Sequence, residues 1–121
     1  MAGKTTEENW EGVSEGARTV IQFNEIGDTF IGFYEGKEVV EDPNENEDGT
    51  HDSWEQYNFT GVFPSEVEGE KAAVNAGFDL RRALDQIEPN RYLVRMALVK
   101  LVPVKGQPSP MKSFRVDKRL P

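Results

Sequence analysis

Apolar residues along this chain gather in short segments, and those in the first two-thirds have the character of β-strands. Thr29–Tyr34 is rich in β-forming residues and is interrupted by a glycine, which in a strand marks a bulge, a bend or a close backbone approach. Trp54–Phe59 alternates, with Tyr57 and Phe59 on one side and more polar residues on the other. Lys71–Val74 is a shorter third segment. This part of the chain therefore predicts three strands.

Helical spacing occurs once, after residue 78. Apolar residues recur there at i, i+3, i+4 and i+7, namely Leu80, Ala83, Leu84 and Ile87. Asp79 is placed to cap the N-terminus of this helix, and Pro89 ends it. Beyond the helix, Arg91–Val102 and Met111–Val116 predict two further strands, joined by a proline-rich loop at 103–110.

The order of these elements predicts a mainly-β fold. Three strands, one helix and two strands is the order of the OB-fold, a five-stranded Greek-key barrel, with the α-helix between strands 3 and 4. An α+β sheet with one covering helix is the competing architecture. Residues 1–17 are expected to form a flexible acidic leader, residues 18–121 a single OB-type domain, and Glu41–Asp52 an exposed acidic loop.

Charge divides the chain into two unlike parts. Residues 1–70 hold 18 Asp and Glu against 3 Lys and Arg, whereas residues 71–121 hold 4 against 11, within a net charge of −8. Such an asymmetry indicates that different surfaces meet different partners. The basic part contains the helix, the fourth strand, the proline-rich loop and the last strand, so these elements form the expected anion-binding side.

Catalytic and metal-binding chemistry finds little support in the residues. The chain has no cysteine, and its single histidine, His51, lies in the acidic loop, so neither a catalytic triad nor a thiolate or multi-histidine metal site can be assembled. Asp42–Asn46 begins like a calcium loop, but Glu47 stands where glycine is required and Ser53 where the bidentate glutamate belongs. We therefore expect no enzymatic activity, no cofactor and no metal.

The hydropathy pattern also excludes a membrane-spanning helix. The longest mostly apolar stretch, Tyr92–Val104, contains Arg95 and Lys100 and is shorter than the roughly 20 residues that a span requires. The N-terminal residues lack the apolar segment of a secretion signal. The chain therefore predicts a cytoplasmic protein without membrane contact.

Basic side chains interleaved with aromatic ones carry the most functional information. Arg95 on the fourth strand and Arg115 on the last strand alternate with inward apolar residues and are expected outside, and Lys105 and Lys112 lie in and at the end of the connecting loop. Trp54 shares a strand side with polar residues and is also expected to point outward. Outward aromatic rings beside cations are typical of a groove for single-stranded nucleic acid, where bases stack on rings and cations neutralise phosphates.

The resulting hypothesis is a single-stranded DNA site with two stacking platforms and four phosphate contacts. Trp54 is the first platform and Tyr34 the second, and the phosphate contacts are Arg95, Lys105, Lys112 and Arg115. The competing interpretation is that Trp54 covers an edge of the core and that the basic residues are ordinary surface charge.

Three short segments occur in a recognisable order: Gly27–Gly36 (GDTFIGFYEG), Phe78–Leu84 (FDLRRAL) and Met111–Val116 (MKSFRV). They resemble the small OB-fold single-stranded DNA-binding proteins encoded by bacteriophages. The resemblance implies a protein of phage DNA replication or recombination that binds single strands without sequence preference, in the cytoplasm of an infected bacterial host. It also allows replication or recombination proteins as partners and a homo-oligomeric state.

Two departures from that family bear on the assignment. Glu41–Asp52, which in such a fold lies near the binding side, is acidic, and the last residues, Asp117–Pro121, do not form the acidic tail by which many such proteins recruit partners. Two alternatives therefore stay open. One is a protein-interaction or assembly module that docks a basic partner through its acidic half, and the other is an acidic DNA mimic that inhibits a nucleic-acid enzyme.

Overall fold

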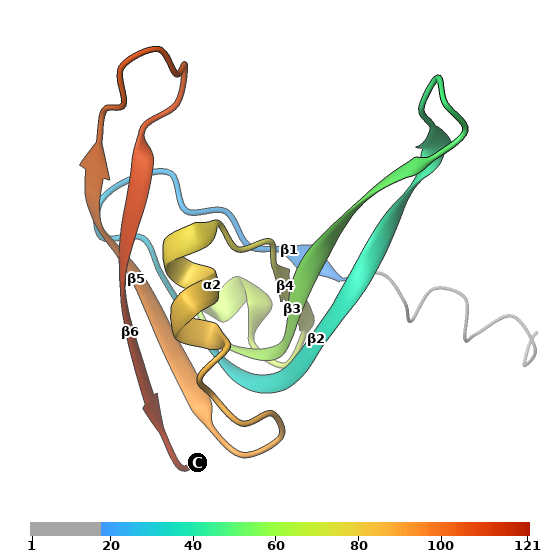
Figure 1. The fold of residues 1–121 in the computed structure, drawn as a ribbon. Coiled ribbons are helices and arrows are strands. Elements are labelled where there is room, and N and C mark those ends of the chain that lie inside the picture. Colours follow the sequence, from blue (N-terminus) through green and yellow to red (C-terminus); the bar gives the residue numbers. More distant parts are fainter. Residues whose placement is uncertain (1–17) are drawn as a thin grey trace, which may run out of the picture.

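The computed structural model describes residues 18–121, most of which belong to one curled β-sheet (Figure 1). Its strands are β1 (Thr19–Val20), β2 (Thr29–Glu45), β3 (His51–Phe63), β4 (Lys71–Val74), β5 (Leu93–Val102) and β6 (Met111–Arg119). They lie in the order β1-β4-β3-β2-β5-β6, with β1 and β4 parallel and all other pairs antiparallel. A short 3₁₀ helix, η2 (Ser65–Val67), and one α-helix, α2 (Phe78–Leu84), complete the described part. The expected leader, residues 1–17, lies outside it.

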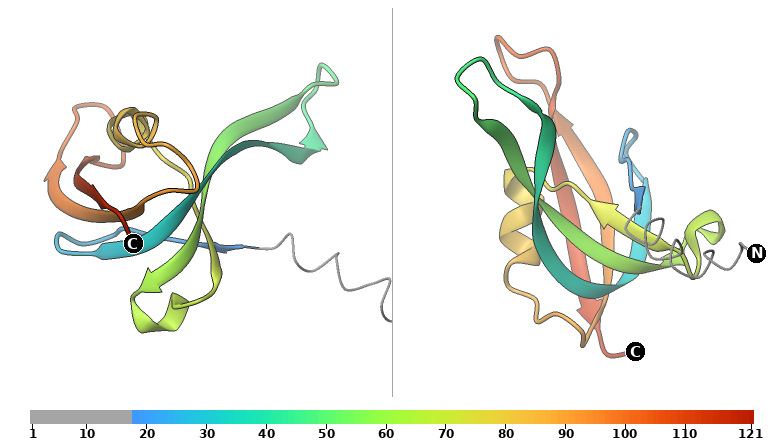
Figure 2. Two further views of the ribbon diagram at one scale, coloured as in Figure 1. Left: turned by 90° about the horizontal axis from the view of Figure 1, so that it is seen from below. Right: turned by 90° about the vertical axis from the view of Figure 1, so that its right-hand side faces the viewer.

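The sheet curls into a half-barrel (Figures 1 and 2). The mainly-β expectation is confirmed, since all five expected strands are present and β1 adds a sixth of two residues. Within residues 18–121 the edge strands β1 and β6 do not pair with each other, so the sheet stays open. Helix α2 lies in the opening and packs against β6 (Figure 1).

Helix α2 begins differently from the expectation. Its N-cap is Gly77, which makes no side-chain cap bond, so the prediction that Asp79 caps the helix is wrong. The carboxylate of Asp79 instead accepts a hydrogen bond from the backbone N–H of Phe114 at 3.1 Å. The backbone N–H of Phe114 is unpaired within the sheet because β6 is an edge strand, and it binds the carboxylate in place of the helix N-terminus. Phe114 lies 35 residues after Asp79, so the sequence around the helix could not indicate this contact. Within residues 18–121 no helix is long and apolar enough to cross a membrane.

Strands β2 and β3 extend beyond the rest of the sheet as a two-stranded ribbon, so the expected loop at Glu41–Asp52 is largely strand. Pairing continues as far as Glu45 opposite His51, and residues 46–50 form the turn. Charged side chains on both sides of the ribbon hide the apolar alternation by which a half-buried strand is predicted. We call residues 37–56 the acidic arm, which projects away from the half-barrel (Figure 2).

The core lies between the concave side of the sheet and α2. Its largest fully buried side chains are Tyr57, Phe30, Phe59, Leu84, Met96, Leu98, Val74 and Val94. Strand alternation directs these residues inward and their neighbours outward. Phe23, from the segment between β1 and β2, packs edge-on against Phe114 of β6 with 5.0 Å between ring centroids. This aromatic pair and α2 cover the open side of the half-barrel.

Gly61 allows η2 to lie directly against β3. A Cβ atom at this position would stand 2.1 Å from the carbonyl oxygen of Val67. The backbone of Gly61 donates to the carbonyl of Glu70 at 2.9 Å and accepts from the N–H of Gly69 at 2.8 Å. Because backbone bonds hold both sides of this contact, only glycine fits here.

Candidate nucleic-acid interface

The convex side of the sheet, away from α2, carries apolar and basic residues at adjacent positions. Backbone pairing forms one row across four strands, which contains Phe63, Ile31, Arg95 and Asp117. A second row contains Thr60, Phe33, Leu93 and Arg119, and a third contains Thr29, Ala97 and Arg115. We call these three rows the outer face. Paired residues point to the same side and neighbouring strands lie about 4.8 Å apart, so a four-strand row spans about 15 Å.

Two aromatic rings belong to the outer face. Phe63 is 48% exposed, and Phe33 is half-buried beside it. Next to these rings the outer face has a shallow groove of about 330 Å³, which is lined among others by Ile31, Leu93 and Arg95. The outer face therefore combines an exposed aromatic ring, aliphatic side chains and a cation at adjacent positions.

A shared carboxylate holds two guanidinium groups of the outer face together. Arg95 donates to Asp117 from Nη2 at 2.8 Å and from Nε at 3.3 Å, and Nε of Arg115 lies 3.3 Å from the same oxygen. The hydrogen bond from Arg95 is the main cause of a lowered pKa at Asp117, with the charge of Arg115 adding to it. All three side chains are exposed, so an incoming phosphate can replace Asp117 as the acceptor.

Further cations lie where β5 begins and β6 ends, beside the second row. The ammonium of Lys118 stands 4.4 Å from the ring centroid of Tyr92, and the guanidinium of Arg91 stands 5.3 Å from it. Lys118 and Arg119 also line the groove. Arg119 therefore extends the cationic character of the outer face to this end of the sheet, whereas Lys118 pairs with the buried Val94 and belongs to the concave side.

Tyr34 does not lie on the outer face, which corrects the expectation that it is a second stacking platform. It is 3% exposed and packs against Phe59 and Tyr57 with ring centroids 5.2 and 6.3 Å away. Burial raises the pKa of its hydroxyl. Alternation along β2 places Tyr34 on the core side with Phe30, whereas Phe33 takes the outward position.

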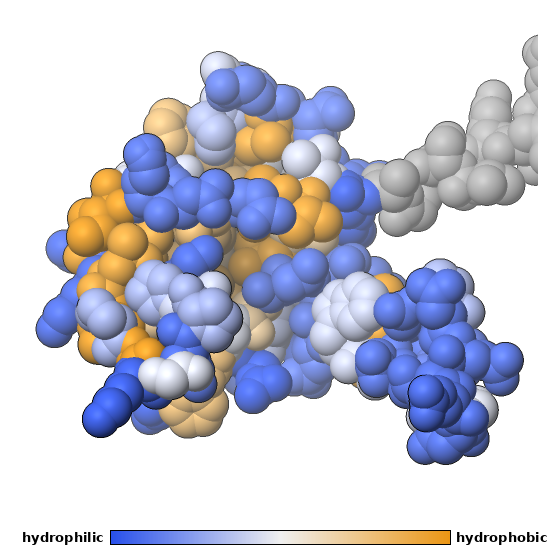
Figure 3. Space-filling view, turned by 90° about the horizontal axis from the view of Figure 1, so that it is seen from above, coloured by the Kyte–Doolittle hydropathy of each residue, from blue (hydrophilic) through white to orange (hydrophobic). Residues whose placement is uncertain are grey.

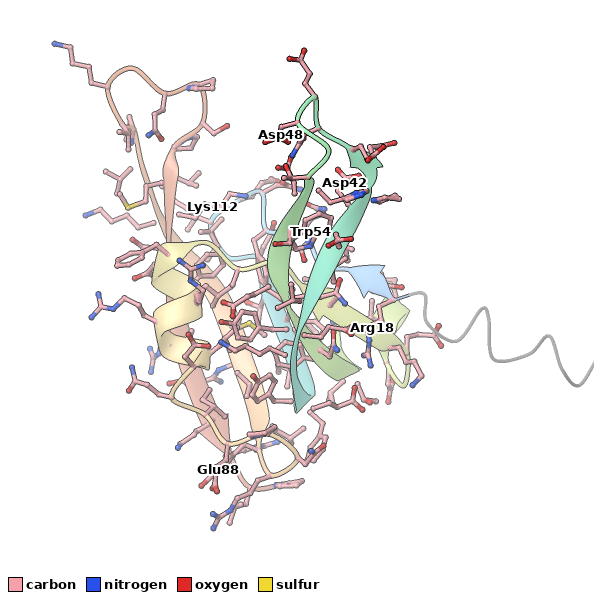
Figure 4. The ribbon with its side chains drawn as sticks, turned by 45° about the vertical axis from the view of Figure 1, so that its right-hand side comes forward. Arg18, Asp42, Asp48, Trp54, Glu88 and Lys112 are labelled. Carbon is pink, nitrogen blue, oxygen red and sulfur yellow. The ribbon has the colours of Figure 1, made fainter. Side chains whose placement is uncertain are left out.

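Trp54 is 39% exposed, on the outward side of its strand, but it lies on the acidic arm opposite Val40. Val40 stands nine residues from Ile31 along β2, which is about 30 Å of strand. Glu38 lies between them on the same side of the ribbon. Figure 4 shows Trp54 below Asp42 and Asp48 on this arm. The structure therefore does not bring Trp54 together with Arg95.

Two of the expected phosphate contacts lie on the β5–β6 hairpin, away from the rows. Lys105 is exposed in the connecting loop. Lys112 begins β6, and its ammonium donates to the backbone carbonyl of Phe23. Of the six expected DNA-binding residues, only Arg95 and Arg115 lie on the outer face.

Three residues of the outer face were missed by the sequence interpretation. Phe33 alternates with the inward residues of its strand, so it points outward. This alternation could have identified Phe33 as an outer-face residue from the sequence. Phe63 and Arg119 lie beyond the predicted ends of their strands, so their side could not be assigned from local alternation. Their membership depends on long-range pairing.

The acidic arm carries hydrogen bonds but no metal-site geometry. The ring nitrogen Nδ1 of His51 lies 2.8 Å from the backbone carbonyl of Asp42. Near the turn, Thr50 donates to the carboxylate of Asp48 from its hydroxyl at 2.6 Å and from its N–H at 3.1 Å. Among residues 18–121 no group of three or more His, Cys, Asp or Glu side chains is arranged to hold a metal ion.

Comparison with known proteins gives no match to a protein-family model, to a curated protein or to a solved structure.

Proposed function

We propose that this protein binds single-stranded DNA without sequence preference, along the outer face. The observation that carries the proposal is the row that contains Phe63, Ile31 and Arg95, flanked by the arginines of the neighbouring rows. We also propose that the half-barrel is of OB type. Its support is the order of β2 to β6, with three strands, a helix and two strands.

Binding would combine stacking with charge neutralisation. Phe63 and Phe33 offer ring faces or edges to bases, and aromatic stacking tolerates any sequence because every base has a π-face. Arg95, Arg115 and Arg119 neutralise phosphates along the strip. Asp117 keeps two of these guanidinium groups in place until a phosphate displaces it.

The acidic arm marks the end of the outer face at which DNA binding would stop. Its carboxylates repel a phosphate backbone, so a strand that follows the outer face is directed across β5 and β6 and away from the ribbon. The separation of Trp54 from Arg95 supports this path. A role in phage replication or recombination, with protein partners from those processes, rests on the sequence resemblance and is part of the proposal.

Fluorescence anisotropy of a labelled oligo-dT, measured over a range of salt concentrations, tests the proposal. Replacing Arg95 and Arg119 together by alanine should flatten the slope of log K against log salt by about 1.4, at about 0.7 for each lost phosphate contact. Phe63→Ala should weaken binding by about fivefold to 150-fold, which corresponds to about 1–3 kcal/mol of stacking. Arg81→Ala, an exposed arginine of α2, is the control and should leave the slope unchanged.

Three results would decide against this site. If the arginine double variant and Phe63→Ala bind like the wild type, the outer face does not bind DNA. If Trp54→Ala weakens binding and Phe63→Ala does not, the strand lies on the arm. If the wild type does not bind oligo-dT even at about 50 mM salt, the exposed acidic arm favours a protein-interaction module.

A further inference from the structure

Two hairpins of opposite charge project from the same side of the half-barrel. The first is the acidic arm, and we call residues 99–112, at the end of β5, the following loop and the start of β6, the basic arm. Both rise above α2 and stand on either side of it (Figure 1), and a view from the side shows both tips at the same end (Figure 2). Among residues 18–121 no ion pair joins them.

The acidic arm has almost no compensating charge of its own. It contains eight carboxylates, namely Glu38, Glu41, Asp42, Glu45, Glu47, Asp48, Asp52 and Glu55, and one cation, Lys37. Within the described residues 18–121, only Glu55 of these eight forms an ion pair, with Lys37 at 3.0 Å. Lys37 also binds Asp85 after α2 at 3.1 Å, so its charge is shared with the body of the protein. Figure 3 shows the arm from above as a hydrophilic lobe.

Among the residues that the structure describes, no other element covers the ribbon of the arm. A two-stranded hairpin without a third strand or a covering element is marginally stable in water. Val39 is 69% exposed, and it alternates with Lys37 and Glu41 on the side that faces α2 and the basic arm. Val39 therefore adds apolar contact area to a side of the arm that is otherwise charged.

The basic arm has the complementary properties. It contains Lys100, Lys105 and Lys112 and no carboxylate. Val99 is 48% exposed and Met111 is 53% exposed. Each arm therefore offers apolar contact area with charge of one sign around it, and the two signs are opposite.

We propose that the protein forms a two-fold symmetric dimer in which the acidic arm of each copy docks on the basic arm of the other. The two arms of one copy cannot neutralise each other, because the sheet holds them on opposite sides of α2. A two-fold axis that passes between the arms sets each acidic arm against a basic arm, and the contact occurs twice. The proposal does not depend on DNA binding, since the outer face lies on the convex side of the sheet.

Sedimentation velocity at two salt concentrations tests the dimer. Attraction between exposed charges extends about 30 Å at 0.01 M salt and only about 3 Å at 1 M, so a dimer at low salt should dissociate at high salt, with the mass falling twofold. Two charge reversals sharpen the test. One carries Glu38→Lys, Glu41→Lys, Glu45→Lys and Glu47→Lys, which change the charge of the acidic arm from −7 to +1. The other carries Lys100→Glu and Lys105→Glu, which change the charge of the basic arm from +3 to −1.

Each reversal variant should be monomeric alone at low salt, because its two arms then carry the same sign. An equimolar mixture of the two variants should form a dimer again, since one contact then joins two unaltered arms and the other joins two arms with exchanged signs. The control, Glu66→Lys with Glu68→Lys at η2, changes the net charge by as much as the basic-arm reversal does, in the opposite direction, and should dimerise like the wild type. Circular dichroism confirms that each variant is folded.

A wild type that stays monomeric at low salt overturns the proposal, and so does a dimer that survives either reversal. A mixture that remains monomeric also overturns it, as does binding of the acidic arm to a basic protein with no self-association. Oligo-dT binding by the same samples is measured separately. A wild type that binds oligo-dT but forms no dimer refutes the dimer alone, and a wild type that forms the dimer but does not bind oligo-dT refutes the outer-face site alone.

Discussion

Asp117 restrains two arginines of the outer face, so neutralising it should improve DNA binding. Asp117→Asn keeps the size and most of the shape of the side chain and removes the charge that holds Arg95 at 2.8 Å and Arg115 at 3.3 Å. Both guanidinium groups can then bind phosphates without displacing a carboxylate. The change also removes a negative charge from the path of the strand.

The magnitude follows from the number of released cations. In the wild type the single carboxylate offsets one of the two guanidinium charges, so its removal is equivalent to one additional phosphate contact and steepens the salt dependence by about 0.7. A tenfold reduction in salt should therefore favour the variant over the wild type by a further fivefold, which is about 10 to the power 0.7. Exposed ion pairs contribute little to folding, so the variant should retain its structure.

Anisotropy titration of labelled oligo-dT at several salt concentrations gives both affinity and slope. Glu68→Gln is the matched control, because it removes one exposed carboxylate that is not paired with an outer-face arginine within the described residues. The control should change the slope much less than Asp117→Asn does. A folded Asp117→Asn protein with an unchanged or flatter slope would show that Arg95 and Arg115 do not meet phosphates, and the reasoning would fail.

Two further predictions concern folding. Gly61→Ala forces a Cβ to within 2.1 Å of the Val67 carbonyl and should destabilise the protein by about 3 kcal/mol, a fall of roughly 12–20 °C in Tm by thermal melting. Gly77→Ala, with no atom within 4 Å, should cost less than about 1 kcal/mol, and equal losses would refute the clash. The hydrogen bond from Tyr57 and the charge of Lys37 lower the pKa of Asp85 below its usual 3.8, so this stabilisation is present above about pH 4 and is lost as the pH falls further. Urea titrations between about pH 2.5 and 7 should show a shallower acid decline for Tyr57→Phe, and an unchanged decline would contradict the assignment.

The sequence alone determined which strand side faces the core in the central segments. Tyr57 and Phe59 are buried as alternation predicts, and so are Val94 and Met96 of β5. The helical stripe was equally readable, since Leu80 and Leu84 are buried against the sheet. These properties repeat every two or 3.6 residues because the backbone geometry of strand and helix imposes that period.

The length of the β2–β3 ribbon could not be predicted in this way. Its outer part is polar on both sides, and pairing with the opposite strand rather than burial keeps it extended. An acidic segment with Pro43 and Gly49 has the composition of a loop. Only the register of the hairpin shows that it is a projecting arm.

Charge asymmetry was evident from the sequence, but its arrangement in space was not. The sequence placed acidic residues in one part of the chain and basic residues in another, and alternation directed Arg95 outward. The tertiary structure decided that Phe63, Ile31 and Arg95 are neighbours, that Tyr34 is buried, and that Trp54 stands on the acidic arm. The side of a strand to which a residue points is a local property of the backbone. The residues that become its neighbours on other strands depend instead on the strand register, on bulges and on the curl of the whole sheet.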